Sequence, residues 1–211
     1  MVYDLNLPAW KWPFYVTRHP IEGYEDLRWK KGYNMKVALV IVLIFFLVSV
    51  AQSLMTGFIF NTSQTKYFFV VPYISSTIVL FFTWVVANWS LCTLFNGEGT
   101  MRNICCVSAY ALVPYLASVV INTAASNVLL RTEEGFLSFI SVVGVAWSFI
   151  LMVSGMKAVH QYSIPKTLIA MFFTLAAMVV MVFLAVLLVV LFQQVFVFFY
   201  TIYTEILYRI S

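Results

Sequence analysis

Long apolar runs separated by short polar segments dominate the pattern of the chain. An α-helix rises 1.5 Å per residue, so about 20 apolar residues cross the roughly 30 Å of hydrocarbon in a bilayer. Runs of this length occur at five places, and none of them contains Asp, Glu, Lys or Arg. They predict five transmembrane helices, at residues 37–60, 68–95, 103–130, 136–156 and 167–200.

The segments between these runs have the composition of loops. They are polar, charged or glycine-containing, and they lie at residues 61–67, 96–102, 131–135 and 157–166. The last apolar run, residues 167–200, is longer than a perpendicular crossing requires. We expect this helix to tilt or to project beyond the membrane.

The overall composition supports the same class of protein. Of the 211 residues, 63% are hydrophobic and 9% are charged, whereas roughly a quarter of the residues of a soluble domain are charged. One core in a chain of this length cannot bury so many apolar side chains, so the excess must face the bilayer. We therefore predict an all-α polytopic membrane protein, with an N-terminal arm at residues 1–36 and a five-helix transmembrane domain at residues 37–211.

The basic residues predict the orientation of the helices, because Lys and Arg are retained on the cytoplasmic side during insertion. With a cytoplasmic N-terminus, nine of the 12 basic residues lie inside: Lys11, Arg18, Arg28, Lys30, Lys31, Lys36, Arg102, Lys157 and Lys166. Three lie outside: Lys66, Arg131 and Arg209. Since the number of helices is odd, the C-terminus is then external.

The N-terminal arm contains one predicted short helix, at residues 21–31. Pro20 precedes it, acidic side chains lie near its positive end, and Asp26 and Lys30 are spaced for a surface ion pair. Two interpretations stay open. The helix either lies on anionic lipid or against a partner, or it is a flanking segment that only fixes the orientation.

Small and polar residues predict how the helices pack, because they let backbones approach closely where lipid supplies no hydrophobic drive. In the fourth helix these residues are Gly144, Ser148 and Gly155, and Pro114 should bend the third helix. We expect the second to fourth helices to form the centre of the bundle. The fifth helix, which is almost uniformly apolar, should face lipid or another subunit. The bend at Pro114 is either a cavity wall or an ordinary packing kink.

The predicted helices contain no residues of a catalytic site. They hold no nucleophile with a base, no paired carboxylates and no metal-binding cluster, so we predict no enzyme activity, no cofactor and no metal. The turn at residues 96–100 lacks the lysine and the spacing of a phosphate-binding loop. Glu98 and Arg102 in this region are expected to form a surface ion pair. The lack of charge within the helices also disfavours an ion-coupled carrier.

Four polar residues on the predicted cytoplasmic side are candidates for binding a partner. Glu98, Arg102, Lys157 and His160 belong to the two loops on that side, where charge, glycine turns and histidine converge. We predict that a larger membrane protein contacts them, and we expect no nucleic acid among the partners.

Three separated segments resemble Yip1-domain membrane proteins, in particular the short bacterial members. The first segment is His19, Pro20, Ile21, Glu22, Gly23 and Tyr24, with Lys30 and Lys31 before the first helix. The second is Asn88 and Trp89, then Gly97, Glu98, Gly99 and Thr100, then Ala109, Tyr110, Ala111 and Pro114. The third is Gly155, Met156, Lys157, Ala158, Val159 and His160, with Ser163 and Lys166.

The resemblance implies a five-helix bundle with a cytosolic N-terminus and a non-catalytic role as a scaffold or accessory subunit in the cell membrane. Bacterial members of this family look like genomic neighbours of carbohydrate ABC transporters, so the implied partners are the lipid bilayer and the permease of such a transporter. Two alternatives stay open. One is an autonomous transporter or channel for a small solute, and the other is a trafficking adaptor of the Golgi or endoplasmic reticulum membrane.

Overall fold

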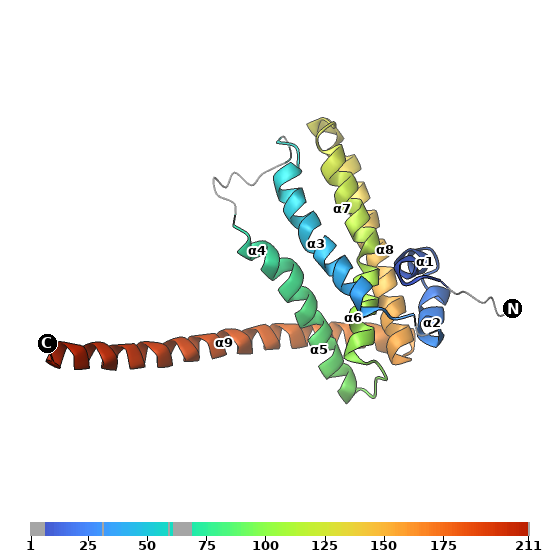
Figure 1. The fold of residues 1–211 in the computed structure, drawn as a ribbon. Helices are drawn as coiled ribbons and strands as arrows, with labels where there is room; N and C mark the ends of the chain where they lie inside the picture. Colours follow the sequence, from blue (N-terminus) through green and yellow to red (C-terminus); the bar gives the residue numbers. More distant parts are fainter. Residues whose placement is uncertain (1–6, 31, 59, 61–68, 211) are drawn as a thin grey trace.

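The computed structural model describes residues 7–30, 32–58, 60 and 69–210, and every regular element in these ranges is a helix (Figure 1). The N-terminal arm forms a 3-10 turn, η1 (Ala9–Lys11), and two short helices, α1 (Trp12–Arg18) and α2 (Glu22–Trp29). The other elements are α3 (Met35–Met55), α4 (Val71–Ile74), the π-helical turn η2 (Ser75–Val79), α5 (Leu80–Leu94), α6 (Met101–Ala111), α7 (Val113–Ala125), the 3-10 turn η3 (Arg131–Glu133), α8 (Glu134–His160) and α9 (Ile164–Ile210).

Five helical stretches are long and apolar enough to cross a membrane, which confirms the predicted fold class. They are Met35–Met55, Val71–Leu94, Met101–Ala125, Arg131–His160 and Ile164–Arg209. The predicted polar break at residues 61–67 and the predicted start of the second helix at residue 68 lie outside the described residues. The orientation of the two ends relative to the cytoplasm stays a prediction.

Capping residues determine where two of the spans begin. The side chain of Asn34 accepts hydrogen bonds from the backbone N–H groups of Lys36 and Val37, at 3.0 and 3.3 Å, so α3 starts two residues before the apolar run. Thr100 accepts from the N–H of Asn103 at 3.3 Å and starts α6 in the same way. Each cap satisfies backbone donors that have no partner within the helix.

The third span is broken at Leu112, beside Pro114, where the sequence predicts a bend. A proline ring has no N–H and disturbs the preceding turn. The backbone N–H of Tyr115 donates to the hydroxyl of Ser148 on α8 at 3.0 Å. The predicted packing residue Ser148 therefore supplies an acceptor at the break in the neighbouring span.

The centre of the bundle is α6. Its residues from Ile104 to Ala111 are all buried, between α3, α5, α8 and the N-terminal arm. The arm contributes Trp12, Val16, Tyr24 and Leu27 to this core, so it packs as part of the bundle. Helix α1 was not expected from the sequence. The expectation that the second to fourth spans form the centre is correct for the third span only, because the second packs mainly against α9 and α6, the fourth packs mainly against α7 and α6, and both are otherwise mostly exposed.

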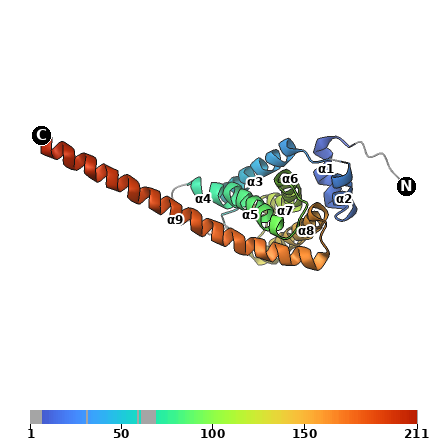
Figure 2. The same ribbon diagram turned by 90° about the horizontal axis from the view of Figure 1, so that it is seen from below.

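Helix α9 leaves the bundle beyond Met178, the last of its buried residues (Figures 1 and 2). It packs against α5 through Ala170, Met171, Thr174 and Met178, which are buried. Residues 182–209, here called distal α9, are exposed throughout. At 1.5 Å per residue the 47 residues of α9 extend about 70 Å, more than twice the hydrocarbon thickness. Distal α9 extends away to one side of the bundle and runs across the direction of α3, α7 and α8 (Figure 1). Whether it tilts within the membrane or projects beyond it stays a prediction.

Two glycines permit the closest approach of helices, and we predict that alanine at either is destabilising. A Cβ atom at Gly144 would overlap the side chain of Ser118 on α7, and one at Gly155 would overlap Val107 on α6. Such overpacking costs about 1–3 kcal/mol. Gly135 is the matched control, because a Cβ there meets nothing within 4 Å. Melting temperatures in mild detergent should fall for G144A and G155A but not for G135A, and equal values for all three would contradict this packing.

Candidate functional site

Polar side chains collect at the end of the bundle where α2, the α5–α6 turn and the C-terminus of α8 meet. We call this region the polar junction. It comprises Arg28 of α2, Asn88 of α5, Glu98 of the turn, Arg102 of α6 and His160 of α8. Three of the four residues predicted to bind a partner belong to it. The fourth, Lys157, lies one helical turn before His160.

Arg28 connects three segments of the junction. Its guanidinium donates to the carbonyl oxygens of Ala158 and Val159 at 2.7 and 2.9 Å and forms an ion pair with Glu98 at 2.6 Å. The last carbonyls of a helix have no partner within it, and a cation there also complements the helix dipole. Arg28 thus caps α8 and at the same time fixes the α5–α6 turn. The sequence gives no signal for this role, because the contacts span 70 to 131 residues.

The expected ion pair between Glu98 and Arg102 is wrong. Glu98 pairs with Arg28, and Arg102 donates instead to the backbone oxygen of Tyr33 at 3.3 Å. Glu98 precedes the Thr100 cap, whereas Arg102 lies in the first turn of α6, so the two side chains belong to different backbone segments. Lys157 and Glu25 form a separate pair between α8 and α2 at 3.8 Å.

His160 is 2% exposed, so the structure corrects its predicted place on the partner-binding surface. Its Nε2 lies 3.0 Å from Oδ1 of Asn88, and the Asn88 amide donates to the hydroxyl of Thr174 at 3.2 Å. Because the amide nitrogen of Asn88 donates to Thr174, its oxygen accepts from Nε2–H. These hydrogen bonds link α8, α5 and α9 in the interior of the protein.

The α5–α6 turn covers His160 by using glycines. A Cβ atom at Gly97 would lie 2.6 Å from His160 Nδ1, and one at Gly99 would lie 2.6 Å from His160 Cε1. Any side chain at either position would displace the imidazole. The glycines recognised in the sequence as a tight turn therefore also allow close contact with the histidine.

The loop between α8 and α9 holds the C-terminus of α5. The ring of Tyr162 stacks on His160 at 5.3 Å, and its hydroxyl donates to the carbonyl oxygen of Phe95 at 3.1 Å. Lys166 donates to the same oxygen at 3.1 Å. Burial raises the pKa of Tyr162 to about 12, so its hydroxyl keeps its proton at neutral pH.

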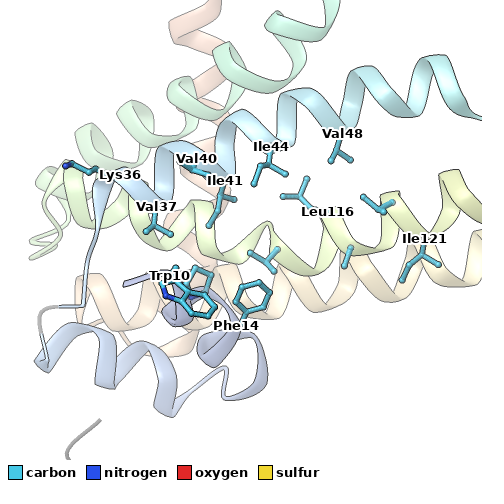
Figure 3. A pocket seen from close by; sticks show the side chains of 14 residues that line it. Trp10, Phe14, Lys36, Val37, Val40, Ile41, Ile44, Val48, Leu116 and Ile121 are labelled. Atoms are coloured by element: carbon cyan, nitrogen blue, oxygen red, sulfur yellow. The ribbon is translucent and has the colours of Figure 1, made fainter. Parts of the chain in front are cut away.

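The hollows among the described residues include three that are large enough to hold a small molecule. One of about 730 Å³ lies between the N-terminal arm and α3 and α7, and Figure 3 shows its lining by apolar side chains with Lys36 at one end. One of about 550 Å³ lies beside the break at Pro114 and is also lined by mainly apolar side chains. The third, of about 370 Å³, is polar and is lined by Arg28, Tyr33, Glu98, Arg102, Asn103 and Val159.

Within the described ranges, no three His, Cys, Asp or Glu side chains lie close enough together to hold a metal ion. The cysteines Cys92, Cys105 and Cys106 are free and buried.

The fold and the junction together describe a polytopic helical membrane protein with a cluster of polar contacts between helices at one end. The model of the Yip1 domain matches residues 14–189, and the chain belongs to this family. The matched range contains the whole polar junction and ends within distal α9. No curated protein matches the chain significantly, and no solved structure does.

Arg28→Ala should destabilise the protein more than Glu98→Ala. The first change removes the ion pair and two hydrogen bonds to carbonyls of α8, of which only the Ala158 carbonyl keeps another donor, Gln161. Hydrogen bonds to charged groups contribute about 1.5–3 kcal/mol. The second removes one partly exposed ion pair, which is worth about 1 kcal/mol or less. Thermal melts in mild detergent measure both, and equal losses would contradict the capping role of Arg28.

Gly97→Ala should lower the melting temperature by displacing His160 and Tyr162. The cost expected for such a clash is about 1–3 kcal/mol. Removing the imidazole relieves the part of the clash that involves His160, so Gly97→Ala combined with His160→Ala should lose less than the sum of the two single changes. Strict additivity in the double-mutant cycle would show that the turn does not depend on this contact.

Proposed function

We propose that the protein is a non-catalytic accessory subunit that binds a larger integral membrane protein through distal α9. The observation that carries this proposal is the exposure of residues 182–209, a continuous helix with no protein contact along most of its surface. Family membership supports the coarser statement that the chain is a membrane protein.

The composition of distal α9 favours a protein partner over lipid alone. Gln193 and Gln194 lie in the middle of an apolar sequence, and among the described residues neither amide has a hydrogen-bond partner. An amide in hydrocarbon is costly unless it is paired, and glutamines in membrane helices form hydrogen bonds across helix interfaces. Aromatic side chains surround them, including Phe192, Phe196 and Phe198, which are enriched in protein interfaces.

More specifically, we propose that the partner is the permease of a carbohydrate ABC transporter. It is supported by the resemblance of the sequence to bacterial Yip1-domain proteins. A transport role for the chain by itself has less support, because the two larger hollows are lined by apolar side chains that do not suit a polar solute.

The test is purification in mild detergent at native expression, followed by identification of the proteins that come with the chain. Gln193→Leu with Gln194→Leu keeps the helix and its hydrophobicity but removes both amides, and it should reduce recovery of the partner about ten-fold, since paired amides in membranes contribute about 1–2 kcal/mol. The rival binding surface is tested by Glu98→Ala with Arg102→Ala, which should retain the partner if distal α9 is the contact. If the Glu98 and Arg102 variant loses the partner and the glutamine variant retains it, recognition occurs at the polar surface that includes Lys157. Solute uptake by the purified chain alone in liposomes would contradict the accessory role.

A further inference from the structure

The hollow of about 370 Å³ at the polar junction is the only one of the three described whose lining is mainly charged or polar. Its volume falls in the lower part of the range of small-molecule sites, about 300–1,000 Å³. Two guanidinium groups, Arg28 and Arg102, reach it from different helices. One carboxylate, Glu98, faces them, so the lining carries a net charge of +1 (two positive, one negative).

The two arginines differ in how many N–H donors remain available for a ligand. Arg28 is occupied by Glu98 and by two carbonyls of α8. Arg102 makes one hydrogen bond of 3.3 Å to Tyr33 and has no ion pair within the described ranges. A guanidinium has five N–H donors arranged to match the oxygens of a phosphate or carboxylate. Arg102 therefore retains donors for an anion.

Asn103 adds a further donor to the same hollow, its side-chain amide. Tyr33 also lines the hollow, but its hydroxyl is inaccessible to solvent and is therefore not a donor to a bound anion. The hollow also adjoins the first turn of α6, where the helix dipole favours negative charge.

The position of the hollow identifies the kind of anion. Arg102 is the last charged residue before 28 uncharged residues, 103–130, so it lies where the third span enters the hydrocarbon. Trp29 follows Arg28 on α2 and is 75% exposed, as is typical of tryptophans at the headgroup level. Phosphate groups of phospholipids occupy this depth of a bilayer. We propose that the hollow binds the phosphate of an anionic phospholipid headgroup, with Arg102 as the principal ligand and Asn103 as a further donor.

The experiment measures lipid binding to the purified full chain by native mass spectrometry, with phosphatidylglycerol and phosphatidylcholine as probes. The parent should bind phosphatidylglycerol preferentially. Arg102→Gln should weaken this binding about ten-fold, because it removes a charge-assisted contact. Arg131→Gln is the matched control, since it removes the same charge at the opposite end of the fourth span.

A variant that should strengthen lipid binding distinguishes the loss of a ligand from the loss of folding. Glu98→Gln removes the one carboxylate that lines the hollow and should increase the affinity for phosphatidylglycerol. Melting temperatures confirm that each variant is folded. The proposal is overturned if Glu98→Gln and Arg102→Gln weaken binding equally, or if Arg131→Gln weakens it as much as Arg102→Gln. The other source of phosphate, a small soluble ester, is tested by calorimetry with glycerol 3-phosphate. If glycerol 3-phosphate binds in a way that depends on Arg102, and the protein does not prefer phosphatidylglycerol, the lipid assignment is overturned.

Discussion

The guanidinium of Arg28 is the contact through which the N-terminal arm, the α5–α6 turn and the end of α8 hold one another. Its hydrogen bonds to Ala158 and Val159 and its ion pair with Glu98 act on segments that are far apart in the sequence. The five spans contain no charge deep in the bilayer, so their mutual positions depend on close packing and on polar contacts at their ends. A cap that ties three segments at one end therefore determines how the helices above it are aligned.

The interior beneath this cap is specified by hydrogen bonds and glycines together. The chain from His160 through Asn88 to Thr174 links three spans, and each buried group in it would be costly if its neighbour were absent. Gly97 and Gly99 allow the turn to lie against the imidazole, which keeps water from these groups. Polar side chains in this region thus favour one arrangement of the helices. The more numerous apolar side chains contribute burial, but they do not select one neighbouring helix over another.

The number and type of the spans could be predicted because a helix must contain about 20 apolar residues to cross the hydrocarbon, and runs of that length are visible in the sequence. Their ends could be predicted less well, since Asn34 and Thr100 start helices by side-chain caps, and α1 lies in an aromatic segment around Pro13 without helical periodicity. The break at Pro114 follows from proline chemistry alone. The roles of Arg28 and His160 depend on long-range contacts, which no local pattern records, and a polar residue near a loop is easily mistaken for a surface residue.

The polar junction and distal α9 divide the surface of the molecule into two regions with different chemistry. The junction uses its charges mainly to hold its own helices, and Arg102 is the member whose donors remain largely available. Distal α9 contributes little to the stability of the bundle, because its side chains contact no other helix there. A headgroup held at Arg102 would stabilise one end of α6 without restricting α9. Loss of lipid at the junction and loss of a protein partner at Gln193 and Gln194 should therefore be independent, and a variant that combines Arg102→Gln with the two glutamine changes should show the sum of both defects.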